Sequence, residues 1–406
     1  MTSTELRADN RDSYWPDDWG LLLSAFATAY GIGLLSLLAL PFLIGSAMAT
    51  LSLNAAQAGM LSTLEFVGIT VSSLTIAPKM DTINRRIVAY SGVLIALTAN
   101  ILSALVDSYE MLTMLRPLAG IGAGLAMACG NATVSNSKNP ERFAGQMSVL
   151  CVGMVILVAL IFPRLSANWG LSGIYTGMVV TIILMAFLMR RLPANAGYNG
   201  RQYVTDVGVS EGSSKLPALF VLAAFIAFSL RDTMAWTFVE RIGTEVGYSS
   251  IEVGNLLSMQ AIIGMIGPLI ASIVGARYGL KAPVSIGVFL SGVVTYVVSQ
   301  SSGSQLTYTV AVMCWAGTYF FTLPYLTALA AEIDVKGRVV AASGSALMMG
   351  IAIGPAIGGE LIVAANGYDL VGLATIICVI MTYLCVLVPL VSLYKKQSYQ
   401  LTTIND

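Results

Sequence analysis

The amino-acid sequence predicts an all-α membrane protein of twelve transmembrane helices in two pseudo-symmetric six-helix bundles. Three observations lead to this fold class: the composition, the number of apolar runs and the alternation of basic loops. Of 406 residues, 56% are hydrophobic and only 10% charged, and the mean hydropathy is +0.80. Soluble domains carry roughly 25% charged residues, so a lipid bilayer is the solvent that suits this chain.

Twelve apolar runs approach the roughly 20 residues that a spanning helix needs. They lie at about 19–45, 55–77, 87–107, 111–134, 143–163, 170–189, 216–240, 251–274, 282–300, 307–330, 339–363 and 368–394. The preceding residues, 1–18, are polar and lack the basic-then-apolar pattern of a cleaved signal peptide. The first apolar helix is therefore expected to be retained.

The longest polar connection lies near the middle of the chain and is rich in Gly, Asn and Ser. It divides the chain into two bundles of six helices joined by a cytoplasmic linker. The expected parts are a cytoplasmic tail (1–18), a first bundle (19–190), the linker (191–215), a second bundle (216–394) and a cytoplasmic C-terminal tail (395–406).

The two halves also share a short pattern. Gly59 precedes Glu65 by six residues in the second run, and Gly254 precedes Gln260 by six residues in the eighth. From Gly59 to Gly254 the chain advances by nearly half its length. Repeated bundles of this kind are typical of transporters, whose solute site lies between the repeats near the bilayer midplane.

Basic residues are concentrated in alternate loops. The positive-inside rule then places these loops and both termini in the cytoplasm. Seventeen of the 21 basic residues fall on that side. They are Arg7, Arg11, Lys79, Arg85, Arg86, Lys138, Arg142, Arg190, Arg191, Arg201, Lys215, Arg277, Lys281, Lys336, Arg338, Lys395 and Lys396.

Composition also excludes several functions. The net charge of zero gives no indication of a nucleic-acid partner, and the absence of histidine rules out histidine metal sites and Ser-His-Asp chemistry. All five cysteines fall inside apolar runs without metal-ligand spacing and are interpreted as small buried hydrophobes. No enzyme activity, metal site or cofactor is predicted.

The loop after the second run carries a family resemblance. It reads Ala77-Pro-Lys-Met-Asp81-Thr-Ile-Asn84-Arg85-Arg86. This is similar to the cytoplasmic signature of the major facilitator superfamily, in which glycine leads to an acid and then a basic pair. Asp81, Arg85 and Arg86 match. The resemblance implies an ion-pair latch of these three residues that favours the outward-open conformer; alternatively, the basic pair only sets topology.

Two glycine patterns extend the resemblance over nearly the whole chain. Arg116-Pro-Leu-Ala-Gly120-Ile-Gly122 is similar to the family pattern of the fourth helix. The segment from Gly350 to Gly359 resembles a glycine-proline pattern of antiporters, but it occurs in the eleventh run instead of the fifth. Close helix packing in lipid is the alternative explanation for both patterns.

Four charged residues stand out because they lie well inside predicted spans, where each costs roughly 2.5–3.5 kcal/mol on insertion scales. Glu65 is the favoured candidate for proton coupling, and Asp232 is a second candidate. Arg116 and Arg231 are candidates for binding an anionic solute, although Arg116 could instead pair with Glu65 at similar depth. Glu240, near the end of the seventh run, could simply be solvated together with the following arginine.

Neutral residues complete the expected site. Gln260 can form hydrogen bonds but cannot titrate, and Trp315 and Tyr319 share one stripe of the tenth run. These aromatic side chains suit an aromatic or amphipathic solute, or else they only pack or face lipid. Structural hydrogen bonding between helices is the corresponding alternative for Glu65.

The resemblance implies a monomeric secondary transporter of the bacterial inner membrane. We expect alternating-access transport of a small organic solute, preferably an organic anion or aromatic metabolite, coupled to protons as a symporter or antiporter. A multidrug or metabolite efflux antiporter is the alternative within this class. A membrane-embedded sensor that binds without transport is the alternative outside it.

Overall fold

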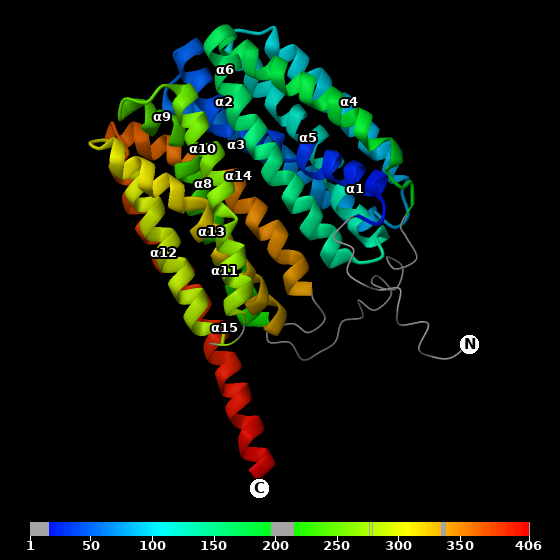
Figure 1. Ribbon diagram of the computed structural model, residues 1–406, viewed down its shortest axis with the longest axis vertical. Helices are drawn as coiled ribbons and strands as arrows, with labels where there is room; N and C mark the ends of the chain where they lie inside the picture. Colours follow the sequence, from blue (N-terminus) through cyan, green and yellow to red (C-terminus); the bar gives the residue numbers. More distant parts are fainter. Residues whose placement is uncertain (1–15, 196–214, 276, 278, 334–337, 406) are drawn as a thin grey trace.

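The computed structural model describes residues 16–195, 215–275, 277, 279–333 and 338–405, and every regular element in these ranges is a helix (Figure 1). The first half contains α1 (Trp19–Phe26), η2 (Ala27–Ile32), α2 (Leu35–Leu51), α3 (Ala55–Ile76), η3 (Ala77–Lys79), α4 (Arg85–Ala104), α5 (Tyr109–Thr133), η4 (Val134–Asn136), α6 (Pro140–Leu188) and η5 (Met189–Arg191). The second half contains α8 (Lys215–Trp236), α9 (Val239–Glu245), α10 (Ser250–Gly264), α11 (Ile266–Val274), α12 (Lys281–Ser299), α13 (Gln305–Ile333), α14 (Arg338–Ala365) and α15 (Asp369–Asn405).

Eleven helical stretches within the described ranges are long and apolar enough to cross a membrane. One of them, Arg142–Arg191, has 50 residues and reverses direction at Gly170. A Cβ atom on Gly177 would lie under 3.0 Å from the side chain of Leu165, whereas a straight helix would separate these positions by about 18 Å. This stretch therefore accommodates two of the twelve expected crossings.

The reversal depends on the residue at its corner. Gly170 has φ 58° and ψ −144°, a conformation that side-chain-bearing residues rarely adopt. The chain thus turns on one glycine, without the polar loop that separates most of the other helices. The expected break between 163 and 170 exists, but the first helix continues to the residue before the glycine.

Capping residues explain why other helices begin where they do. Asn54 and Ser249 each form a capping box at the start of α3 and α10. Asn84, Ser108 and Asn139 accept backbone hydrogen bonds at the starts of α4, α5 and α6. Each side chain satisfies an amide that the first helical turn leaves unpaired, which matters next to a bilayer that offers no water.

The expected tails and linker are only partly described. Residues 1–15 and 196–214 lie outside the described ranges, and with them most of the N-terminal tail (1–18) and of the linker (191–215). At the other end, α15 continues to Asn405, through the segment expected to be a tail after residue 394. Figure 1 shows this part of the helix projecting beyond the rest of the molecule.

The two halves meet mainly through α3 against α14 and α6 against α10. A Cβ atom on Gly59 would lie under 3.0 Å from the carbonyl oxygen of Pro355, and one on Gly254 equally close to the oxygen of Ala159. The repeated glycines of the two halves therefore have the same role, because each lets its helix approach the backbone of the other half.

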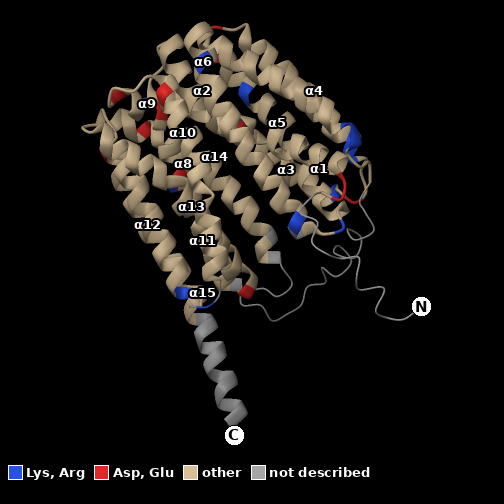
Figure 2. Ribbon diagram, viewed as in Figure 1, with Lys and Arg blue, Asp and Glu red and all other residues tan. Residues whose placement is uncertain are grey.

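Both contacts lie at the ends of the helices that are remote from the basic loops. The backbone N–H of Ala356 donates to Thr63 Oγ1 at 3.0 Å in the same region, and nearer the middle of the spans Trp236 Nε1 donates to the carbonyl of Leu37 at 3.2 Å. We call this region the junction. Figure 1 shows α2, α9 and α10 side by side here, and Figure 2 shows acidic residues gathered around α9.

The hydrophobic core is also shared unevenly between the two halves. One cluster runs from the first half across the junction into the second half, where it includes Phe238, Val253 and Tyr308. A second cluster, with Val284 and Leu329, occupies the part of the second half nearest the basic loops and contains no residue of the first half. In the described residues, the two halves share the first cluster, which also contacts Leu347 and Met348 of α14, whereas the cluster nearest the basic loops belongs to the second half alone.

The junction contact at Gly59 can be tested by adding a single methyl group. We expect Gly59→Ala to lower the apparent melting temperature of the detergent-purified protein, because its Cβ atom would collide with a backbone oxygen. Gly153→Ala is the matched control, since nothing lies within 4 Å of that position. Alanine favours helix over glycine by about 1 kcal/mol, so the control should be neutral or stabilising. Equal shifts in both variants would contradict the close approach.

Candidate functional site

Glu65 and Arg116 form a buried ion pair inside the first half. Arg116 Nη1 lies 3.1 Å from Glu65 Oε2, and the two side chains are only 0% and 2% exposed. A glycine one turn further along α5 sets their separation, because Gly120 lies directly against the backbone of Glu65. The direct pairing that the sequence left open as one alternative is therefore present.

Side chains from three further helices enclose this pair. Arg116 Nη1 donates to Asn100 Oδ1 at 3.3 Å, and its Nη2 donates to the hydroxyl of Ser103. The guanidinium carbon stands 4.4 Å from the ring centre of Tyr175, and Ser36 donates to the second oxygen of Glu65. The cation is thus bound on several sides, and only its Nε is buried without a hydrogen bond.

Arg231 in the second half is much less completely bound. Its Nη1 donates to Ser291 Oγ at 2.8 Å, and its guanidinium carbon lies 4.7 Å from the ring centre of Phe228. Its Nη2 is 3.6 Å from Asp232 Oδ1, too far for a hydrogen bond, and both Nη2 and Nε are buried without a partner. This arginine retains unused hydrogen-bonding capacity.

Asp232 points away from its neighbour toward aromatic side chains. Its Oδ1 accepts a hydrogen bond of 2.7 Å from Trp315 Nε1, and 21% of its side chain is exposed. Trp236 meets Trp315 edge-on at 5.9 Å, and Tyr319 stacks at 5.0 Å on the phenylalanine beside Arg231. The two aromatic residues expected from the tenth run, Trp315 and Tyr319, thus lie beside the second pair.

The remaining expected residues are distributed differently. Gln260 is 4% exposed, and in the described part of the chain no hydrogen bond joins it to either charged pair. Arg85 donates to the carbonyls of Met80 and Ala132, and Arg86 to that of Leu192. Both arginines therefore bind backbone carbonyl groups at helix ends within the first half.

The expected latch takes a different form in this structure. Asp81 is exposed, and the ion pairs among the described residues are those of Glu65 with Arg116 and of Arg231 with Asp232. The basic pair thus contacts carbonyl groups in place of a carboxylate. Carbonyls at helix C-termini carry partial negative charge, which explains the preference.

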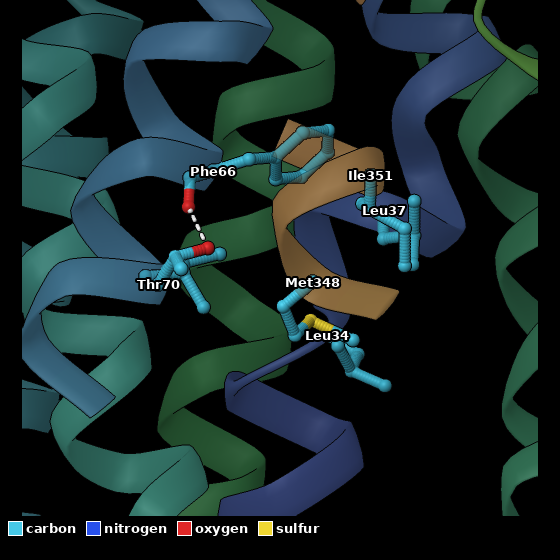
Figure 3. Close-up of a pocket in the computed structure, with 7 residues that line it drawn as sticks. Leu34, Leu37, Phe66, Thr70, Met348 and Ile351 are labelled. Atoms are coloured by element: carbon cyan, nitrogen blue, oxygen red, sulfur yellow. Dashed lines mark hydrogen bonds between the residues drawn. The ribbon is translucent and has the colours of Figure 1, made fainter. Parts of the chain in front are cut away.

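A small void lies where the halves meet, and Figure 3 shows its lining. Its volume is about 10 Å³, room for roughly one water molecule. Leu34 and Phe66 of the first half face Met348 of the second, and the hydroxyl of Thr70 donates to a backbone carbonyl. The void is apolar and too small for an organic solute, so the candidate site consists of the charged groups.

Several partners in these clusters were not expected from the sequence. Asn100 and Ser103 are polar residues inside an apolar run, which is the one signal that could have indicated them. Ser291 gives the same weak signal, whereas Tyr175 gives none, because a tyrosine in a spanning helix has many possible neighbours.

The ion pair of the first half can be tested by a double-mutant comparison. Removing one partner of a buried pair costs about 3–5 kcal/mol, because the other charge remains uncompensated. Arg116→Leu should therefore lower the apparent melting temperature more than the double variant Glu65→Gln, Arg116→Leu. The same detergent melting assay measures both. Additive destabilisation by the two changes would contradict a strong pair.

Sequence comparisons find similarity to known transport proteins over part of the chain. Residues 219–401 match the model of the Major Facilitator Superfamily. A putative metabolite transport protein of Haemophilus influenzae is 27% identical over 178 residues. The matched region covers 43% of each of the two chains, so less than half of that relative is aligned.

Solved structures match the whole fold. The nucleoside transporter NupG has a TM-score of 0.68 at 13% identity, covering 92% of this chain and 98% of its own. A bacterial homologue of the human lysosomal transporter Spinster, in an inward-facing and occupied conformation, has a TM-score of 0.66 at 14% identity, covering 92% and 95%. A D-xylose–proton symporter has a TM-score of 0.62 at 14% identity, covering 90% and 95%. The second half of the chain therefore matches the model of the Major Facilitator Superfamily, and the chain as a whole shares its fold with these three transporters.

Proposed function

We propose that the protein is a monomeric secondary active transporter that moves a small organic solute across the bacterial inner membrane by alternating access, coupled to protons. The family match of residues 219–401 and the shared fold support transport, and the positive-inside rule supports cytoplasmic termini. The solute class favoured is an organic anion or an aromatic metabolite. One observation carries this choice: the incompletely bound guanidinium of Arg231 beside aromatic side chains.

We assign the described conformation to the inward-facing state of the proposed cycle, and the position of the junction supports this assignment. The halves share backbone contacts and a core at the junction, at the end remote from the basic loops. If those loops are cytoplasmic, the junction closes the opposite side. The proposed latch of Asp81, Arg85 and Arg86 would be released in this state, in keeping with the contacts of both arginines to their own half.

The structure favours Arg231 over Arg116 as the ligand of a solute anion. Arg116 is bound by Glu65, Asn100 and Ser103, so a solute would have to displace partners that already compensate its charge. Arg231 has one hydrogen bond and a carboxylate at 3.6 Å. Its Nη2 and Nε could receive a carboxylate, the geometry for which a guanidinium is suited.

Asp232 is the carboxylate best placed to couple a proton to solute binding. Its side chain is 21% exposed, whereas that of Glu65 is 2% exposed. Proton uptake by Asp232 would remove the negative charge beside Arg231 and so strengthen the attraction of that arginine for a solute anion. Glu65 remains the second candidate, acting through its pair with Arg116. Gln260 is proposed as a neutral polar contact of the solute.

An efflux antiporter for drugs or metabolites is the alternative. Asp232, with Trp315 and Tyr319 nearby, could also suit a lipophilic cation. The glycine-rich segment of α14 gives antiport no support, because Gly354 packs against Thr233 of α8 and Gly359 against Ala55 of α3. A sensor would bind the solute without moving it.

Proton coupling can be measured in liposomes loaded with a pH-sensitive dye. Organic acids, aromatic metabolites and lipophilic cations are added one at a time to the native protein and to Asp232→Asn and Glu65→Gln variants. We expect an organic anion to cause proton movement that Asp232→Asn abolishes. Labelled-solute flux without any proton signal would contradict coupling. Binding without flux would support the sensor.

The role of Arg231 can be separated from that of Arg116 by kinetics. A hydrogen bond to a charged group contributes about 1.5–3 kcal/mol, so Arg231→Gln should raise the KM of an anionic solute by roughly tenfold to hundredfold. Arg231→Lys, which keeps the charge but not the planar fork, should recover part of this loss. An unchanged KM in Arg231→Gln would refute its assignment as the anion ligand.

A further inference from the structure

A third carboxyl group is buried at the junction. Glu240 lies in α9 near the end of its span, where the sequence suggested a solvated residue. It is 4% exposed, and its Oε2 is buried without a hydrogen-bond partner. The expectation of a solvated side chain is therefore wrong, because a helix of the other half covers this position.

That covering helix is α2, which packs on the carboxyl group through a glycine. A Cβ atom on Gly45 would lie under 3.0 Å from both the Cδ and the Oε2 of Glu240. The carboxyl group thus fills the space left by a missing side chain in the opposite half. This contact exists only while the two halves are together at the junction.

No cation compensates the carboxyl group in this position. Helix α2 contains no ionisable residue. Arg241, the next residue, contributes charge nearby, but it forms no ion pair in the described structure. The hydroxyl of Ser250 at the start of α10 hydrogen-bonds the carboxyl group but leaves its Oε2 unpaired, and Glu252 in the same helix is engaged in the capping box.

The phenolic groups around Glu240 have other partners. Tyr308 of α13 donates to the carbonyl of Val239 at 2.8 Å. Tyr368, between α14 and α15, donates to the exposed Glu245 at 3.1 Å. The surroundings of Glu240 therefore offer a negative charge little stabilisation, and an uncompensated buried carboxylate is strongly unfavourable.

We propose that Glu240 is a proton-binding site of the junction, occupied when the halves close on it and vacated into water when they separate. The proton resides on the carboxyl group that packs against Gly45, and no other group must be ionised to balance it. This inference rests on the proposed alternating access and adds to it a proton site at the interface itself, distinct from the sites within each half.

The sign of the pH effect follows from linkage. Closure retains one proton that the open form releases, so low pH favours the closed junction and rising pH opens it. A single linked proton changes the opening constant by up to about tenfold per pH unit.

Hydrogen–deuterium exchange of the full-length protein in lipid nanodiscs tests this. Peptides covering residues 45–54 and 239–249 are followed at about pH 5 and about pH 8, with correction for the intrinsic pH dependence of exchange. We expect both peptides to be protected at the lower pH and to exchange faster at the higher pH. Glu240→Gln should stay protected at both. Glu245→Gln, an exposed carboxyl group in the same short helix, is the matched control and should behave like the native protein.

Two results would overturn the inference: native protection that does not depend on pH, or a pH dependence that persists in Glu240→Gln. Glu240→Met, with a neutral side chain of similar length, replaces the glutamine variant if that protein is not produced. Opening that occurs without pH dependence would leave alternating access intact. Complete protection of the native protein at every pH would count against both the proton site and the proposed movement.

Discussion

An ionisable side chain in a spanning helix must find its partners inside the protein, because the bilayer core supplies none. The two halves meet this constraint to different degrees. In the first half, Arg116 has a carboxylate, an amide and a hydroxyl as partners. In the second, Arg231 has one hydroxyl and a carboxylate beyond hydrogen-bonding distance. The same fold thus contains one pair that stabilises its bundle and one that retains capacity for a ligand.

The junction between the halves follows a different principle. Small residues allow backbones to approach closely at Gly59 and Gly254, and no described ion pair crosses between the halves. Interactions of this kind depend on close fit, so they are lost together when the halves separate. Because no described ion pair crosses the junction, few charged groups must be rehydrated when it opens. This suits a contact that forms and breaks in the proposed cycle.

The sequence predicted most of the fold, because the bilayer sets helix length and the loops carry the charges. It also placed Glu65 and Arg116 at similar depth, and depth follows from position along a helix. It did not predict which helix faces which: Tyr175 reaches Arg116 only because the chain reverses at Gly170. Glu240 was misjudged for the same reason, since the residue that buries it lies about two hundred positions away in the other half.

The three carboxylates differ in what changes around them when the halves move. The partners of Glu65 all lie in the first half, and Arg231 and Trp315, the partners of Asp232, lie in the second. Only Glu240 is buried by the opposite half. Asp232 is nevertheless connected to the junction, because Trp315 packs against Trp236, whose indole donates to the backbone of Leu37. If the halves separated, this hydrogen bond would be lost and Trp236 could move. Trp315, which packs on Trp236 and donates to Asp232, could then move as well. In the proposed cycle, movement at the junction would therefore reach the carboxylate beside Arg231 through two adjoining indole rings.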